Sequence, residues 1–194
     1  MSSEPILVII SGAPASGKTT LGRRLAAQFQ LPFIGKDDIK EILFETLGWS
    51  DRAWSIKLGI ATYHLLYQAV EVQLRAQRSL VVESNFKGEY ATSKFLSLKR
   101  QYGFQPFQIL CHAELSVLLK RFKVRADSGE RHPGHVEHIL YDELAATQRE
   151  DDYSLLPIGG ASVVVKTNDF ATANFEHVSQ TLRALIHSQG ESSA

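Results

Sequence analysis

The chain has 194 residues, of which 44% are hydrophobic and 22% are charged, which is typical of one globular domain. Lys and Arg together number 21, and so do Asp and Glu, so the balance argues against a nucleic-acid coat or a polybasic membrane binder. The single cysteine, Cys111, excludes an internal disulfide framework and a cysteine-based zinc cage. The apolar run at 6–10 is too short to cross a bilayer and follows Glu4 rather than a basic segment, so we expect a cytoplasmic protein.

Short apolar runs alternate with longer amphipathic segments along the chain. We expect strands at residues 5–10, 32–34, 80–82, 107–111 and 162–165, and helices at 18–28, 39–47, 51–77, 92–102, 115–124, 136–149 and 173–187. The strand runs lack polar alternation, as is typical of a parallel sheet that is covered on both faces. Strands that alternate with helices predict one α/β domain over residues 1–187. Residues 188–194 are small and polar, and we expect them to form a flexible tail.

The segment from Gly12 to Thr19 matches the pattern G-x-x-x-x-G-K-[ST] between an expected strand and an expected helix. Gly12 and Gly17 permit backbone conformations that a Cβ would obstruct, so the backbone amides of the loop and the start of the helix can cradle phosphate oxygens. Lys18 is placed to reach the β- and γ-phosphates, and the Thr19 hydroxyl is placed to bind Mg²⁺. The loop predicts binding of ATP or GTP with Mg²⁺. The residues expected to bind the nucleotide here are Gly12, Ala15, Ser16, Gly17, Lys18, Thr19 and Thr20.

Two adjacent acids, Asp37 and Asp38, follow the second expected strand. In a doubly wound sheet the carboxyl end of that strand lies beside the phosphate-binding loop. A carboxylate there can accept a hydroxyl proton during phosphoryl transfer. We expect one acid to be the base and the other to cap the helix that begins at Ile39, with capping by both as the alternative. Lys40 is a candidate to bind an anionic substrate group, or else a solvated helix residue.

Glu83 and Asn85 follow the third expected strand. In proteins with this phosphate-binding loop, an acid at the strand end orients Mg²⁺ through water, so Glu83 is a candidate metal residue together with Thr19. Asn85 is placed to hydrogen-bond the substrate. The alternatives are an ordinary surface acid and an ordinary turn residue.

The charge is unevenly distributed along the chain, with eight Lys or Arg against three acids at 94–131 and three against nine at 137–194. Arg121 and Arg125 are four residues apart and therefore share one helix face, where they can stack on a base and clamp a phosphoryl group. Residues 127–134 contain two glycines and a proline, which predicts a mobile lid over about residues 121–135. A solvated basic helix face is the alternative.

Three histidines follow at H-x2-H-x2-H spacing, namely His132, His135 and His138. Pro133 and Gly134 interrupt any helix between the first two histidines, which argues against a metal site. Substrate contact, a lid hinge and plain surface positions remain open for them.

These motifs, in this order and spacing, resemble those of small P-loop kinases. The likeness is to the group that contains phage polynucleotide 5′-kinase, zeta toxins and chloramphenicol phosphotransferase, often described as AAA-type predicted kinases, and it covers residues 5–187. The resemblance implies a three-layer P-loop NTPase fold, with about five parallel strands in the order 2-3-1-4-5, helices on both faces and a helical lid.

The same resemblance implies roles for individual residues. Where polynucleotide kinases read R-D-D-x-x-R, this chain has Asp37 at the position of the base and Lys40 in place of an arginine that grips a nucleic-acid phosphate. Arg125 matches the lid arginine that contacts the γ-phosphoryl group, and Glu83 stands where Asp is frequent. Residues 167–169 are expected near the adenine.

We therefore expect a Mg²⁺- and ATP-dependent kinase that phosphorylates a hydroxyl of a small-molecule acceptor. Lys18 and Arg125 neutralise the phosphoryl charge and Asp37 accepts the proton. Two alternatives stay open: an NTPase switch that acts through a protein partner, and a polynucleotide 5′-hydroxyl kinase. Lysine at position 40 and the balanced charge argue against nucleic acid. We expect a monomer or weak homodimer with no membrane association.

The expected helix at 51–77 is a candidate wall of the acceptor pocket. Its aromatic neighbours could pack on a ring-containing acceptor or in the core: Trp49, Trp54, Tyr63 and Tyr67. Apolar residues at spacings of three and four predict one buried face, which consists of Trp54, Leu58, Ala61, Leu65, Ala69 and Val72.

Overall fold

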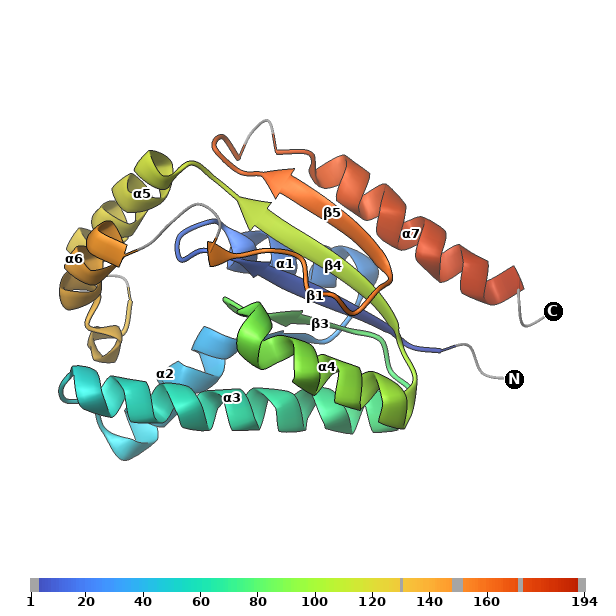
Figure 1. Ribbon diagram of the computed structural model, residues 1–194, viewed down its shortest axis with the longest axis horizontal. Helices are drawn as coiled ribbons and strands as arrows, with labels where there is room; N and C mark the ends of the chain where they lie inside the picture. Colours follow the sequence, from blue (N-terminus) through green and yellow to red (C-terminus); the bar gives the residue numbers. More distant parts are fainter. Residues whose placement is uncertain (1–3, 130, 148–151, 171–172, 192–194) are drawn as a thin grey trace.

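The fold is built on one parallel sheet, seen in a computed structural model that describes residues 4–129, 131–147, 152–170 and 173–191. Figure 1 shows the sheet between two layers of helices. Its strands are β1 (Ile6–Gly12), β2 (Phe33–Gly35), β3 (Leu80–Glu83), β4 (Gln105–His112) and β5 (Ala161–Lys166). The strand order is β2-β3-β1-β4-β5, which confirms the expected order 2-3-1-4-5.

Eight helical segments connect and follow these strands in the described part of the chain. They are α1 (Lys18–Phe29), α2 (Lys36–Leu47), α3 (Arg52–Arg75), α4 (Gly88–Tyr102), α5 (Leu115–Ser128), the 3-10 turn η1 (Pro133–His135), α6 (Glu137–Thr147) and α7 (Phe175–Glu191). Figure 1 shows α5 and α6 arching away from the sheet toward α2 and α3. None of the described helices is long and apolar enough to span a membrane.

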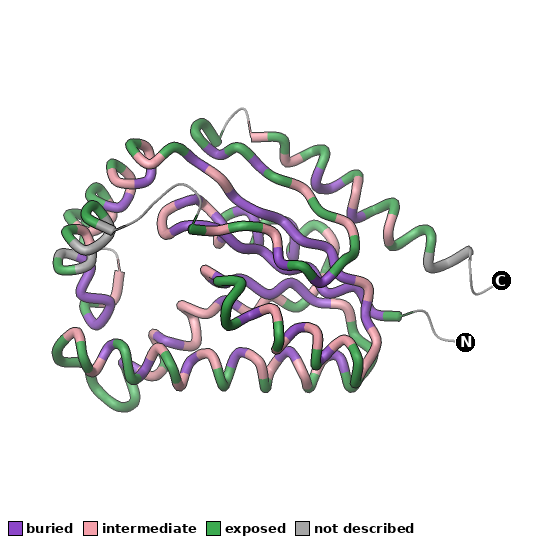
Figure 2. Tube along the Cα trace, viewed as in Figure 1, coloured by how far each residue is buried: buried purple, intermediate pink, exposed green. Residues whose placement is uncertain are grey.

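The central strand β1 is buried at every position, as Figure 2 shows. Alternate side chains of a strand point to opposite faces, so Leu7 and Ile9 join the core beneath α3 and α4. Ile6 and Val8 join the second core beneath α1 and α7. Burial on both faces explains why the strand sequences lack polar alternation.

The buried face of α3 is not the one that the apolar spacing predicted. Leu65 and Val72 are 46% and 49% exposed, whereas the buried residues are Ser55, Leu58, Thr62, Leu66, Val70 and Leu74. Two hydroxyl residues belong to this face because their hydrogen bonds are satisfied: Thr62 Oγ1 donates to the Leu58 carbonyl at 2.7 Å, and Ser55 Oγ accepts from Lys40. The apolar spacing therefore missed this face because two of its buried residues carry hydroxyl groups.

The carboxyl-terminal helix is longer than the sequence indicated. A tail was expected from residue 188, but α7 continues to Glu191. Its inward side chains Val178 and Leu182 are fully buried against α1 and the sheet, so packing of the first turns anchors the helix.

Candidate active site

The loop between β1 and α1 takes the backbone path that its glycines predict. Gly12 and Gly17 have φ values of 141° and 85°, and Ala15 also has a positive φ of 62°. Gly17 is the N-cap of α1, so the first amides of the helix face the loop. Lys18 is 7% exposed, and its Nζ donates to the Ala13 carbonyl at 2.8 Å.

A pocket of about 610 Å³ opens beside this loop and gathers most of the predicted site residues. Those that line it are Ala15, Gly17, Lys18, Thr19, Thr20, Asp37, Lys40, Glu83, Asn85, Arg121 and Arg125. Gly12 ends β1 and Ser16 is buried inside the loop. Although the chain is neutral, eight lysines and arginines line the pocket against three carboxylates. Such a surplus of positive charge favours anionic ligands.

Thr19 and Glu83 meet at the carboxyl edge of the sheet. The Thr19 hydroxyl donates to Glu83 Oε2 at 2.9 Å, and Glu83 is 4% exposed. Burial raises the pKa of Glu83, while nearby Lys18 acts in the opposite direction. A hydroxyl and a carboxylate side by side at a phosphate-binding loop are oxygen ligands of the kind that Mg²⁺ takes together with phosphates. These residues fit the expected metal.

The loop and helix α5 each hold one buried polar atom without a partner. Among the described residues, Ser16 Oγ and Arg121 Nη1 are the buried side-chain atoms that lack a hydrogen-bond partner. Buried polar groups are normally paired. Both atoms can donate, so an acceptor atom of a bound ligand would satisfy each of them.

Asp37 and Asp38 do not cap α2, in contrast to the expectation. The helix begins at Lys36 with Gly35 as its N-cap, so both acids lie in its first turn and neither makes a capping hydrogen bond. Asp37 forms an ion pair with Arg131 and lines the pocket. Asp38 accepts from Arg23 at 2.6 Å and lies outside the pocket lining. The geometry therefore separates the two acids and leaves Asp37 as the candidate base.

The charges around Asp37 keep it ionised. Burial alone would raise its pKa, but the guanidinium of Arg131 and the ammonium of Lys36 outweigh this effect and hold the pKa of Asp37 below its ordinary value. Asp37 is thus a carboxylate at neutral pH, which is the form that accepts a proton.

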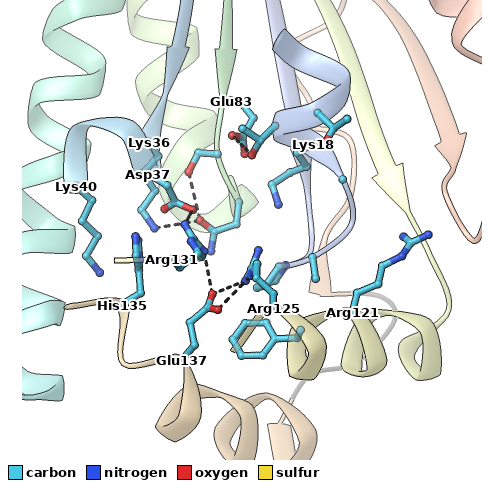
Figure 3. A pocket seen from close by; sticks show the side chains of 18 of the residues that line it. Lys18, Lys36, Asp37, Lys40, Glu83, Arg121, Arg125, Arg131, His135 and Glu137 are labelled. Carbon is cyan, nitrogen blue, oxygen red and sulfur yellow. Dashed lines mark hydrogen bonds and ion pairs between the residues drawn. The ribbon is translucent and has the colours of Figure 1, made fainter. Parts of the chain in front are cut away.

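Arg125 and Arg131 share one buried carboxylate, that of Glu137 at the start of α6. Arg125 Nη2 lies 2.6 Å from Glu137 Oε1 and its Nε donates to Oε2 at 3.2 Å. Arg131 Nη1 donates to Oε1 at 3.0 Å. Figure 3 shows the Arg131 guanidinium between Asp37 and Glu137, with Arg125 beside Glu137. Arg125 was expected in the site from its spacing, whereas the roles of Arg131 and Glu137 were not expected from the sequence.

Arg121 points to a different part of the pocket from Arg125, although the two share a helix. Its Nη2 donates to the Asn168 carbonyl at 3.0 Å, and its guanidinium lies 5.3 Å from the centre of the Phe170 ring. That ring in turn covers the phosphate-binding loop, since a Cβ on Gly17 would come within 1.8 Å of it. The segment after β5 therefore reaches the loop.

The described histidines between α5 and α6 contact α2. His135 Nε2 lies 3.0 Å from Glu41 Oε1, and His132 Nε2 lies 3.2 Å from Glu45 Oε1. The Phe44 ring stacks on His132 and meets His135 edge-on, at centroid distances of 5.0 and 5.2 Å. Burial lowers the pKa of His135 to about 3, so its contact with Glu41 is a hydrogen bond of a neutral ring. The side chain of His138 lies outside the described residues.

Asn85 lines the pocket and is held by its neighbours. Tyr63 OH and Lys36 Nζ donate to Asn85 Oδ1 at 3.1 and 3.3 Å.

The four aromatic residues expected at the acceptor wall are not among the pocket-lining residues. Helix α3 contributes Arg52 to the pocket instead. Trp49 is 51% exposed, and Trp54 Nε1 donates to the Gly48 carbonyl.

A family comparison agrees with this geometry. The chain matches the model of a family described as AAA domain over residues 7–149. The chain belongs to this AAA domain family. The AAA domain also matches the crystal structure of a candidate kinase from Chloroflexus aurantiacus J-10-fl, with 37% identity, a TM-score of 0.85, and coverage of 93% of this chain and 97% of that chain. No match was found among curated proteins.

Two more distant crystal structures share the fold of the AAA domain. A sugar kinase from Janibacter sp. HTCC2649 is 18% identical with a TM-score of 0.53, and covers 94% of this chain and 93% of its own. Shikimate kinase from Bacteroides thetaiotaomicron is 17% identical with a TM-score of 0.50. The match covers 94% of this chain and 98% of that chain. At these identities the likeness concerns the fold alone. This AAA domain is a small P-loop kinase-like domain.

Replacing Glu137 by glutamine is expected to lower the free energy of unfolding by about 1.5–3 kcal/mol, the range for hydrogen bonds to charged groups. The substitution keeps the side-chain shape but removes the charge that binds Arg125 and Arg131. Urea unfolding measures the change, with Glu89→Gln on the exposed start of α4 as control. An equal loss in both variants would mean that the Glu137 charge adds no net stability.

Proposed function

We propose that the protein is a Mg²⁺- and ATP-dependent kinase that transfers the γ-phosphoryl group to a hydroxyl of a small-molecule acceptor. The observation that carries this proposal is the placement of the Asp37 carboxylate in the same pocket as the phosphate-binding loop. A switch NTPase needs no such carboxylate. A base beside the phosphates is what hydroxyl phosphorylation requires.

The proposed chemistry divides among four groups of the pocket. The acceptor hydroxyl gives its proton to Asp37 while its oxygen takes the γ-phosphoryl group, and ADP leaves. Lys18 and Arg125 bind the phosphoryl oxygens and neutralise the charge that develops on them. Thr19 and Glu83 would hold Mg²⁺, which supplies neutralisation of the phosphate charge when bound. Arg121, beside Asn168 and Phe170, is placed to contact the nucleotide base.

Arg131 has two partners that constrain its role. It pairs with Asp37 on one side and with Glu137 on the other. An arginine on the base lowers the basicity of Asp37, so transfer requires that Arg131 shift from Asp37 toward phosphate oxygens. Because Glu137 also binds Arg125, this one carboxylate can position both guanidinium groups.

The test of the function is an acceptor search. The protein is incubated with Mg²⁺, γ-labelled ATP and a fractionated metabolite extract, with Lys18→Ala in parallel. A labelled organic phosphate that the variant does not form would establish a kinase and identify the acceptor. Release of inorganic phosphate alone, across fractions and with added RNA and DNA 5′-ends, would contradict the proposal and favour the switch NTPase.

Replacing Arg125 by alanine is expected to lower kcat about 10²-fold, the effect of losing one donor to developing charge. The affinity for ATP should change much less, because the contact strengthens as charge develops. Steady-state kinetics and equilibrium ATP binding separate the two effects. Lys123→Ala is the matched control, since Lys123 lies on the same helix with an exposed side chain. A change confined to ATP affinity would make Arg125 a ground-state ligand only.

A further inference from the structure

Lys40 is a buried cation whose Nζ lies 5.2 Å from the centre of the Phe44 ring. Lys40 is 8% exposed, and its Nζ donates to Ser55 Oγ at 2.9 Å. Within the residues that the structure describes, no carboxylate forms an ion pair with Lys40. An ammonium has three donors, and a buried charge is costly unless it is paired.

The groups that face Lys40 are mainly cations. Lys36 on its own helix, Arg52 on α3 and Arg131 on the lid all act on it, together with the Asp37 carboxylate. That carboxylate already pairs with Arg131, and His135, which also faces Lys40, is neutral because its pKa is about 3. Burial lowers the pKa of Lys40 to about 8, and the Lys36 charge adds to this effect. An anion at this position would therefore be strongly stabilised.

The position of Lys40 assigns it to the acceptor rather than to the nucleotide. It follows Asp37 by three residues, so both side chains lie on one face of α2. Figure 3 shows Lys40 and Lys36 on one side of Asp37, and Lys18 and Arg121 on the other. A group that binds Lys40 is thus on the far side of the candidate base from the phosphate-binding loop.

We propose that the acceptor is a small hydroxylated anion whose carboxylate or phosphate group binds Lys40 beside Ser55 while its hydroxyl faces Asp37. This assignment of substrate class rests on the proposed kinase function. It narrows the acceptor to hydroxy acids and phosphate monoesters and disfavours neutral sugars and alcohols. Lys36 and Arg52 line the same pocket and add positive charge near Lys40.

The direct test follows the Lys40 ammonium by NMR in protein with ¹³C-labelled lysine, with Lys40→Arg used to assign the signal. Saturating Mg²⁺ and ADP keep added anions away from the phosphate-binding loop. Glycerate and glycerol 3-phosphate are added separately, with glycerol as the neutral probe. At least one of the two anions is expected to raise the pKa of Lys40 by about one unit or more, as a nearby opposite charge does. Glycerol should leave the pKa unchanged.

The outcomes decide both the site and the kind of anion. The anion that gives the larger shift identifies carboxylate or phosphate as the preferred group. The exposed Lys57 on α3 is the internal control and should not respond. If neither anion moves the pKa of Lys40, or if glycerol moves it equally, the proposal is wrong.

The same experiment is independent of phosphoryl transfer. A response of Lys40 combined with no labelled product from any extract would leave the anion site in place and overturn the kinase function. Transfer to an acceptor combined with an unresponsive Lys40 would overturn the anion site alone. A Lys40→Met variant should keep wild-type ADP affinity, because Lys40 lies away from the loop, while its KM for the identified acceptor rises at least about tenfold, the equivalent of 1.4 kcal/mol. Unchanged KM would contradict the assignment.

Discussion

Replacing Lys18 by alanine is expected to abolish phosphoryl transfer while the fold remains intact. Lys18 is the cation nearest the start of α1, and its Nζ already points to the loop carbonyl of Ala13. Phosphates that bind the loop would meet this ammonium at the position where negative charge develops. No other lysine belongs to the described loop.

The fold should survive this substitution because it removes a charge that is costly to bury, while Glu83, which loses a nearby cation, keeps its hydrogen bond from Thr19. Burial lowers the pKa of Lys18, which shows that its environment opposes the charged form. Single-turnover transfer of labelled phosphate measures the activity, and urea unfolding measures the stability. Lys123→Ala, on the exposed side of α5, should behave as wild type. Undiminished transfer by Lys18→Ala would refute the nucleotide site.

The parts of this protein that could be predicted are those with local signals. The strand β1, the loop at Gly12–Thr19 and the helix α1 are contiguous in the chain, and the glycine conformations and apolar run are properties of that segment alone. The order of the strands followed from the resemblance that this segment and the shorter motifs supported. Residues at strand ends, such as Glu83, gather because parallel strands share one carboxyl edge.

The remaining errors arise where partners are distant in the sequence. Arg131 lies in a loop rich in charge, and nothing local distinguishes its role from that of Lys123. Its pairing with Asp37 depends on how far α5 and η1 reach across to α2. Glu137 is a single acid in the sequence, and no local pattern indicates that it binds two arginines. The buried face of α3 was misplaced for a similar reason, since the hydroxyl of buried Ser55 has its partner, Lys40, on another helix.

Replacing Asp37 by asparagine is expected to lower the rate of phosphoryl transfer by about 10²–10⁴-fold, the range for a general base. Asparagine keeps the size of the side chain but cannot take a proton at neutral pH. The nucleotide affinity should change little, because Asp37 lies on α2 rather than on the loop. Asp38→Asn is the matched control, since Asp38 pairs with Arg23 outside the pocket. A larger loss in Asp38→Asn would reverse the assignment of the base.

The same pair of proteins tests the electrostatics by acid unfolding. The pKa of Asp37 in the folded protein lies below its ordinary value, which is about 3.9 in an unfolded chain. The stability that comes from this shift is therefore fully present above about pH 5 and is lost as the pH falls toward the folded-state value. Wild type should exceed Asp37→Asn in free energy of unfolding near neutral pH, and the difference should shrink on acidification. Urea unfolding at a series of pH values measures it, and a difference independent of pH would show that Arg131 and Lys36 do not stabilise the Asp37 carboxylate.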